Sequence, residues 1–373
     1  MKKVDIITIV DNVNYGTYLQ AFATAKIVMI LKHKVEIINY IRPYISPIQV
    51  AKEYLKNDQM SFLKKWSYAF FYVTLYPYMI WQVKRFLTKR VKMTKKYKSY
   101  KDLKKNPPKA DIYITGSDQV WNSDYNNGID KSFFLDFIDG DKYAYAASVG
   151  INSFGTNERE DVFLLLAKYR SISVRESFGV DALHEIGLNG VIQVLDPTFL
   201  LTKEERISVI KKRSFKKKEK YLLIYSVESS RNELVLKQAI AVAKTLQLKI
   251  YWVCPTYKFR RQLNGVDQVF NFASVEFFLE LMADADFIIA SSFHGTAFAV
   301  NFNKQFLTIS PGKYNTRVCS LLKLCKLENR YIAKEVVDIV DLDSIDYSSV
   351  NHILAKNRED SMNYLKTFLS NKL

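Results

Sequence analysis

Residues 285–302, with the sequence ADFIIASSFHGTAFAVNF, decide the fold class of this chain. The apolar residues Phe287 to Ala290 predict a buried strand, and residues 296–302 predict the start of an apolar helix. Between them lie Ser291, Ser292, His294 and Gly295. A strand that leads directly into a helix is typical of parallel α/β sheets, whose ligands bind at the carboxyl ends of the strands.

The chemistry of this turn suits an anion. Free N–H groups and the positive end of the helix dipole attract negative charge. Ser292 can donate from its hydroxyl, and Gly295 lets a ligand approach the backbone. His294 can bind or transfer a proton near neutral pH, and a bound phosphate would raise its pKa. The competing interpretation is a core histidine that is satisfied by a backbone carbonyl.

Strands and helices alternate on both sides of this turn. Residues 4–10 and 34–40 predict strands on either side of a helix, which is a βαβ opening. The pattern starts again with a strand at residues 221–227, after a Lys-rich segment at 203–220. We therefore expect an α/β protein with two Rossmann-like, doubly wound domains that face a cleft.

The same pattern predicts where the domains begin and end. The N-terminal α/β domain should cover residues 1–205, with an aromatic and basic helical insertion at about 50–105. The C-terminal α/β domain should cover residues 206–345. Residues 346–373 predict an amphipathic helix that packs back on the N-terminal domain.

A second polar turn follows a predicted strand at residues 116–122, GSDQVWN. Its carboxylate, amides and indole make a good surface for sugar hydroxyls. The candidate binding residues here are Asp118, Gln119, Trp121 and Asn122. The alternative is an Asx-type turn with Trp121 packed in the core.

Three further places in the sequence carry candidate anion-binding residues. Asn14, Tyr15 and Gly16 form a glycine-containing turn at a helix start, which also favours an anion. Arg175 follows a predicted strand and Arg317 opens a late helix, so either could form a fork on a carboxylate or phosphate. For each arginine, a surface position or an ordinary ion pair is the alternative. No cluster of His or Cys predicts a metal site.

The formal net charge of +17 favours anionic partners. The basic runs carry no RNA-binding or helix-turn-helix pattern, so nucleic acid is not expected. Residues 66–83, WSYAFFYVTLYPYMIWQV, are uncharged and aromatic and precede one basic run. They predict either an interfacial element on anionic lipid or a helical lobe packed on the domain. The three cysteines form no CxxC pair and no signal peptide is expected, which indicates a reducing cytosol.

Seven segments, in order along the chain, resemble the polysaccharide pyruvyl transferase family. They are NYGTYLQAFA (14–23), DIYITGSDQVWN (111–122), AYAASVG (144–150), SVRE (173–176), LDPTFLL (195–201), SSFHGTAFAVNF (291–302) and NTRVCSLL (315–322). Thr316 stands where the family often has Ser. The aromatic segment at residues 66–81 is not part of the resemblance.

The resemblance implies a fold similar to the two-domain GT-B glycosyltransferases. It implies phosphoenolpyruvate as the donor, a cell-surface glycan or its lipid-linked precursor as the acceptor, and a pyruvate ketal as the product. No cofactor or metal is implied. The N-terminal domain would then lie on the acceptor side and the C-terminal domain on the donor side.

Within that reaction, His294 is the expected general acid or proton shuttle. The donor would be held by Ser292, Gly295, Arg317 and Arg175. The acceptor would be lined by Asn14, Tyr15, Gly16, Asp118, Gln119, Trp121 and Asn122. The expected location is the cytoplasm, at the inner face of the membrane if lipid is contacted.

Two other functions remain open from the sequence. One is a GT-B glycosyltransferase that uses a nucleotide sugar, since it would share the fold. The other is a non-enzymatic basic protein that binds membrane or glycan through residues 84–105.

Overall fold

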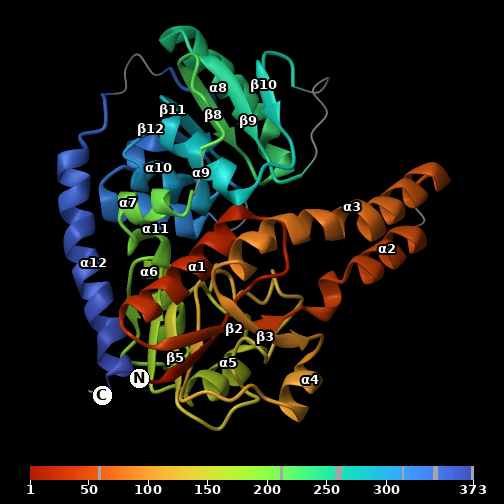
Figure 1. The fold of residues 1–373 in the computed structure, drawn as a ribbon, viewed down its shortest axis with the longest axis vertical. Coiled ribbons are helices and arrows are strands. Elements are labelled where there is room, and N and C mark those ends of the chain that lie inside the picture. Colours follow the sequence, from red (N-terminus) through yellow and green to blue (C-terminus); the bar gives the residue numbers. More distant parts are fainter. Residues whose placement is uncertain (58–59, 211–212, 257–262, 313–314, 339–342, 371–373) are drawn as a thin grey trace.

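The structure is a computed structural model with two α/β domains, a projecting helical hairpin and a long C-terminal helix (Figure 1). It describes the chain except residues 58–59, 211–212, 257–262, 313–314, 339–342 and 371–373. Part of the Lys-rich segment at 203–220 therefore lies outside the described residues.

The N-terminal domain is built on a seven-stranded parallel sheet of order β3-β2-β1-β4-β5-β6-β7. The central strands are fully buried apolar runs, as expected when helices cover both faces of a parallel sheet. The strands are β1 (Lys3–Ile7), β2 (Lys34–Tyr40), β3 (Lys92–Tyr97), β4 (Ile112–Thr115), β5 (Lys142–Ala147), β6 (Ser171–Val174) and β7 (Ile192–Gln193). The helices are α1 (Tyr15–Ile30), α4 (Tyr100–Lys105), α5 (Arg159–Leu166) and α6 (Ser177–Glu185).

The C-terminal domain repeats this plan with six parallel strands in the order β10-β9-β8-β11-β12-β13. Its strands are β8 (Tyr221–Tyr225), β9 (Lys249–Val253), β10 (Gln268–Phe270), β11 (Phe287–Ala290), β12 (Gln305–Ile309) and β13 (Tyr331–Ile332). Its helices are α8 (Asn232–Leu246), α9 (Val275–Asp284), α10 (Phe293–Asn301) and α11 (Thr316–Cys325), and α7 (Lys203–Ser208) precedes it. In each sheet, the first strands of the chain are added toward one edge and the later strands toward the other, with the change between β1 and β4 and between β8 and β11. The predicted pair of doubly wound domains is therefore confirmed.

The two domains share one apolar core. Its buried residues come from α1 of the first domain and from β8, α9 and α10 of the second. The side chain of Tyr15, in the first turn of α1, stacks on Phe278 with ring centroids 4.4 Å apart and donates to the Ala273 carbonyl at 2.9 Å. The amino end of α1 is therefore embedded in the C-terminal domain.

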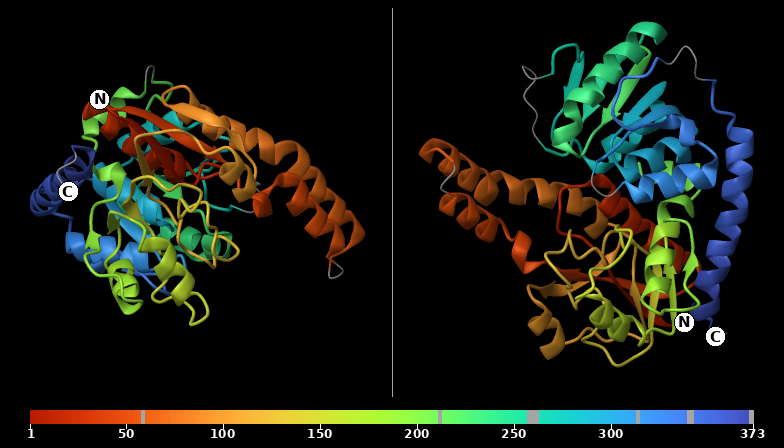
Figure 2. Two further views of the ribbon diagram at one scale, coloured as in Figure 1. Left: turned by 90° about the horizontal axis from the view of Figure 1, so that it is seen from below. Right: turned by 180° about the vertical axis from the view of Figure 1, so that it is seen from behind.

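The insertion in the N-terminal domain forms a hairpin of α2 (Pro47–Lys56) and α3 (Phe62–Thr88). The hairpin projects away from both domains in each view (Figures 1 and 2). The expectation that the insertion is helical throughout is wrong for its end, because Lys92–Tyr97 form the edge strand β3. An edge strand can be rich in exposed lysines, and such a sequence lacks the apolar pattern by which a strand is predicted. Among the described residues, no helix is long and apolar enough to cross a membrane.

The C-terminal helix α12 (Tyr347–Leu369) lies along both domains (Figure 1). Near its start, the Tyr347 hydroxyl donates to the Lys304 carbonyl in the C-terminal domain. Near its end, Phe368 stacks on Tyr143 with ring centroids 4.5 Å apart. The helix thus ties the two domains together on the side away from the hairpin.

Candidate active site

The loops at the carboxyl ends of the two sheets meet between the domains. The first domain contributes residues that follow β1, β4, β6 and β7, and the second contributes the first turns of α10 and α11. Six buried or partly buried ionisable groups gather there: Asp118, Arg175, Glu176, Asp196, His294 and Arg317. This is where doubly wound sheets place their ligands.

His294 lies in the first turn of α10 and is 3% exposed. Its ring packs directly on Gly16 of α1, because a Cβ atom built on Gly16 would lie 2.1 Å from His294 Cγ. His294 Nε2 is 4.0 Å from Asp196 Oδ2 and has no hydrogen-bond partner among the described residues. The imidazole is therefore buried among charged groups with one nitrogen unused.

Arg175 follows β6 and its guanidinium is fully buried. Nη1 donates to Asp196 Oδ2 at 3.0 Å and to Ser117 Oγ at 3.1 Å. The guanidinium lies 4.4 Å from the centre of the Phe293 ring. Nε lies 3.6 Å from Glu176 Oε2 and Nη2 lies 3.6 Å from Asp118 Oδ1, but neither nitrogen makes a hydrogen bond within the described part of the chain. Buried N–H donors without a hydrogen bond are costly, which favours a ligand that offers acceptor oxygens at this position.

Arg317 brings a second cation to the same place from the first turn of α11. Burial and, to a smaller extent, the neighbouring Arg175 lower its pKa to about 10, although Asp118 opposes this shift. The side chain still carries its charge at neutral pH. Its Nε, like two of the Arg175 nitrogens, lacks a partner in the described residues. Two arginines held this close together favour a ligand with more than one negative charge.

Burial also sets the protonation state of His294. It lowers the pKa of His294 to about 4, with Arg175 and Arg317 acting in the same direction against nearby carboxylates. Burial alone would raise the pKa of Asp118 and Asp196, but Arg175 and other nearby donors together outweigh it, so both pKa values lie below their usual range. Without a ligand, the site therefore holds a neutral imidazole beside ionised carboxylates.

This environment predicts an acid-sensitive fold. Since the pKa of His294 is about 4 in the folded protein, the unfolded state binds more protons between pH 6.5 and pH 4. The free energy of unfolding should consequently fall by about 2 kcal/mol from pH 7.5 to pH 5 on account of this residue. Urea unfolding at the two pH values should show that His294→Gln removes this loss. The exposed His352→Gln variant should keep it, and an unchanged pH dependence in His294→Gln would contradict the assignment.

The structure places the other predicted donor residues differently. Ser292 caps α10, and its Oγ accepts from Gly295 N at 3.1 Å, so that N–H is already bonded. Gly295 is required by packing, because an added Cβ would lie 2.8 Å from Ala290 Cβ. Ser292 remains partly exposed at the site, whereas Gly295 lies beneath it.

Among the predicted acceptor residues, the structure brings Asp118 and Gly16 to the site, uses Asn14 as a helix cap and buries Tyr15. The side chain of Asn14 caps α1 by accepting from Gly16 N at 2.9 Å, and it also accepts from the Tyr225 hydroxyl at 3.1 Å. Tyr15 is buried in the interdomain core and offers no surface to a sugar. Asp118 accepts from Thr17 Oγ1 at 2.8 Å and faces the two arginines.

The end of the GSDQVWN turn packs into the core of the N-terminal domain. Trp121 is 1% exposed, stacks on Phe134, and donates from Nε1 to the Phe133 carbonyl. Asn122 is buried and donates to Gln119 Oε1 at 2.8 Å. Trp121 and Asn122 therefore shape the loop and do not line the site. The structure follows the alternative interpretation of this turn, because the indole gains more by burial than by forming a platform.

Several site residues were not identified from the sequence alone. Arg175 is held by Asp196, Glu176, Ser117 and Phe293. All four lie in segments that carry the family resemblance, which was the signal for them in the sequence. Arg42 forms a further buried pair with Asp11, with Nη2 2.8 Å from Oδ1, and thereby fixes the loop after β1. Within the described ranges, no group of three His, Cys, Asp or Glu side chains could hold a metal ion.

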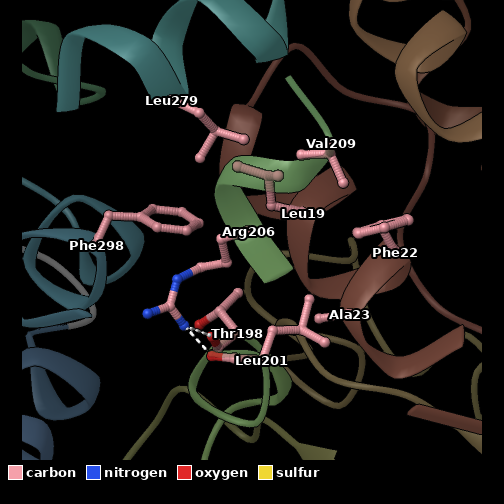
Figure 3. A pocket seen from close by; sticks show the side chains of 9 residues that line it. All are labelled: Leu19, Phe22, Ala23, Thr198, Leu201, Arg206, Val209, Leu279 and Phe298. Carbon is pink, nitrogen blue, oxygen red and sulfur yellow. Dashed lines mark hydrogen bonds between the residues drawn. The ribbon is translucent and has the colours of Figure 1, made fainter. Parts of the chain in front are cut away.

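An apolar cavity between α1, α7 and α10 is separate from this site (Figure 3). It is lined by Leu19, Phe22, Ala23, Thr198, Leu201, Arg206, Val209, Leu279 and Phe298. Its volume of about 10 Å³ is that of one water molecule at most. Arg206 closes it by donating to the carbonyls of Thr198 and Leu201. The cavity is thus a packing gap in the interdomain core and not a substrate site.

Comparison with known proteins identifies the fold and a family. A family model described as polysaccharide pyruvyl transferase matches residues 14–313. No curated protein matches the sequence. A glycosyltransferase from Rickettsia africae has a similar structure, with 12% identity, 99% of each chain covered and a TM-score of 0.54. An S. aureus MnaA–UDP structure has 11% identity, covers 99% of this chain and 97% of that one, and has a TM-score of 0.52. A UDP-GlcNAc 2-epimerase from Neisseria meningitidis has 12% identity, coverage of 99% and 100%, and a TM-score of 0.50. These likenesses confirm the GT-B-like fold.

Proposed function

This chain belongs to the polysaccharide pyruvyl transferase family, and we propose that it moves pyruvate from phosphoenolpyruvate to a glycan sugar as a ketal, with release of phosphate. The observation that carries the proposal is the pair of arginines near His294, Arg175 and Arg317, both of which keep N–H groups without a hydrogen bond among the described residues. Phosphoenolpyruvate has a carboxylate and a phosphate on three carbons, so it presents two anionic groups to two guanidinium groups.

Donor binding would change the state of the histidine. The dianionic phosphate offsets the positive field of Arg175 and Arg317 and raises the pKa of His294 from about 4. The imidazole then takes up a proton at the moment the donor arrives. No metal or other cofactor is part of this proposal, because the charges of the donor are met by side chains.

The proton steps balance with His294 as a shuttle. His294 protonates the methylene carbon of the donor, and the first sugar hydroxyl attacks the resulting oxocarbenium carbon and returns its proton to His294. The carbon–oxygen bond to phosphate then breaks, and phosphate leaves with the electron pair. The second hydroxyl attacks the same carbon, and its proton leaves on the phosphate. The ionised carboxylate of Asp118 faces this position from the N-terminal domain and can orient a hydroxyl by accepting its hydrogen bond.

Access to the site requires the domains to separate. His294 is 3% exposed and is covered by α1, so a donor and a sugar can reach it only when the contact with Gly16 opens. Closure around the substrates would exclude water from the oxocarbenium carbon. The C-terminal helix α12, which contacts both domains, limits how far they can part.

The acceptor is proposed to be a sugar of a surface polysaccharide or its lipid-linked precursor. The sequence has three cysteines and no CxxC pair, which argues against a disulfide framework and supports a reducing compartment on the cytoplasmic side. The direct test mixes the full chain with phosphoenolpyruvate and candidate lipid-linked saccharides and looks for the ketal adduct and free phosphate by mass spectrometry. Stabilisation by nucleotide sugars but not by phosphoenolpyruvate in a thermal shift assay would instead favour a glycosyltransferase.

Arg317→Met is expected to raise KM for phosphoenolpyruvate by about 10–100-fold with a smaller change in kcat, since one charge-assisted hydrogen bond to the donor is lost. Steady-state kinetics with the donor varied would measure this. Arg213→Met is the matched control, because Arg213 is an exposed arginine paired with Asp284 away from the site. An unchanged KM in Arg317→Met would remove Arg317 from the donor site.

A further inference from the structure

The α2–α3 hairpin has more apolar surface than a solvated arm requires. Helix α3 has 27 residues, and its buried side chains are mostly at the carboxyl-terminal end, where Met79, Val83, Phe86 and Leu87 join the domain core. Apart from Ala69, the residues before Met79 are not buried. Figures 1 and 2 show this part of the helix extending beyond both domains with only α2 beside it.

One face of α3 is an apolar stripe. It consists of Phe62, Trp66, Phe70, Val73, Pro77 and Trp81, which are three or four residues apart and so share a face of the helix. Phe62, Trp66 and Phe70 are 72%, 55% and 68% exposed, and Leu63 beside them is 80% exposed. The packing partner α2 uses another face, where Tyr54 stacks on Tyr68 and Tyr72. The fold thus leaves the apolar stripe uncovered.

The charge around the apolar stripe favours an anionic lipid bilayer as its partner. Helix α3 contains no acidic residue. Residues 47–98 hold twelve Lys or Arg and only two acidic residues. Aromatic side chains beside lysines are typical of surfaces that lie in the interface of an anionic bilayer. A second copy of the chain would bring two such basic surfaces together, which like-charge repulsion opposes.

A cavity at the base of the hairpin also fits an anionic lipid. Its volume is about 610 Å³, and Pro47, Ile48, Val73 and Pro77 form apolar walls. Lys96 and Lys98 of the β3 region line it as well and are exposed. Val73 and Pro77 belong to both the cavity and the apolar stripe, so the two surfaces are continuous. Apolar walls beside paired lysines fit a phosphate-bearing headgroup with the start of its acyl chain.

We propose that the α2–α3 hairpin docks this protein on an anionic lipid bilayer, with the apolar stripe in the headgroup layer and the lysines against lipid phosphates. The hairpin lies on the membrane and does not cross it. This inference concerns where the protein works, so it can hold even if the proposed transfer reaction is wrong.

Vesicle flotation tests the proposal. The full chain should bind vesicles of phosphatidylcholine and phosphatidylglycerol at least about tenfold more tightly than vesicles of phosphatidylcholine alone, and added salt should reduce the difference. The variant Phe62→Ser/Trp66→Ser/Phe70→Ser should bind the anionic vesicles about 100-fold more weakly. Lys96→Gln/Lys98→Gln should lose part of the preference for anionic lipid.

The matched control is Leu164→Ser/Leu246→Ser/Val336→Ser, which removes three exposed apolar side chains elsewhere and should bind as the wild type does. Circular dichroism of the hairpin variant should show an intact fold. Failure of the wild type to bind anionic vesicles, or equal binding by the hairpin variant, would overturn the proposal. A wild-type dimer in light scattering that the hairpin variant loses would assign the apolar stripe to a second copy of the chain instead.

Discussion

His294→Gln should lower kcat for ketal formation by about 10²–10⁴, the usual contribution of one positioned acid or base. Glutamine fills nearly the same space and can hydrogen-bond, but it cannot carry a proton to the methylene carbon. The measurement is phosphate release under saturating phosphoenolpyruvate and acceptor.

Donor binding should be coupled to proton uptake by the same residue, His294. Because the pKa of His294 is about 4 without a ligand and rises when the dianion binds, donor binding at neutral pH should take up a proton. Calorimetry in buffers of different ionisation enthalpy would detect this uptake, and it should vanish in His294→Gln. The exposed His352→Gln variant should keep both the rate and the proton uptake. A His294→Gln enzyme within tenfold of the wild type would exclude the proposed shuttle.

Gly16→Ala should abolish most activity although alanine suits the backbone there. Gly16 has no left-handed backbone angle and lies in the first turn of α1, so in an isolated domain the change would stabilise the helix by about 0.5–1 kcal/mol. In the closed protein, the new methyl would lie 2.1 Å from His294 Cγ and 2.3 Å from Nδ1. The domains must then stay apart or the imidazole must turn away, and either change should cost at least about 100-fold in kcat/KM.

Small-angle X-ray scattering should show whether Gly16→Ala keeps the domains apart. Gly140→Ala is the matched control, because its added methyl makes only ordinary contacts of 3.5 Å or more. The double variant Gly16→Ala/His294→Gly should restore compactness without activity, since glycine also removes His294 Cβ, which would lie 2.4 Å from the new methyl. Wild-type activity in Gly16→Ala would mean that this contact does not belong to the working enzyme.

The sequence predicted the repeating framework well because that framework depends on local periodicity. The expected strands at residues 34–40, 221–227 and 287–290 correspond to β2, β8 and β11, and the helix after His294 corresponds to α10. Each is a short apolar run followed by a polar turn. Strands β3, β10 and β13 were not predicted, because edge strands are short or exposed and lack that pattern.

The candidate site was predicted only in part. His294, Arg175, Arg317 and Asp118 come together as a charged cluster, from positions that the sequence placed at strand ends or helix starts. Trp121 and Tyr15 are buried in the core instead, since local sequence does not say whether an aromatic side chain points to a cleft or into a core. The role of Asp196 and Glu176 as ion-pair partners of Arg175 is visible only in the tertiary structure.

The sequence by itself therefore determined the two doubly wound domains and the polar turns at their strand ends, because hydrophobic periodicity and turn chemistry act over a few neighbouring residues. Only the tertiary structure decided that Gly16 of one domain accommodates the imidazole of the other, that Arg175 is buried among three carboxylates, and that the apolar stripe of α3 is left uncovered. These features depend on contacts between segments far apart in the chain. Burial, and with it the lowered pKa of His294, follows from how those segments pack.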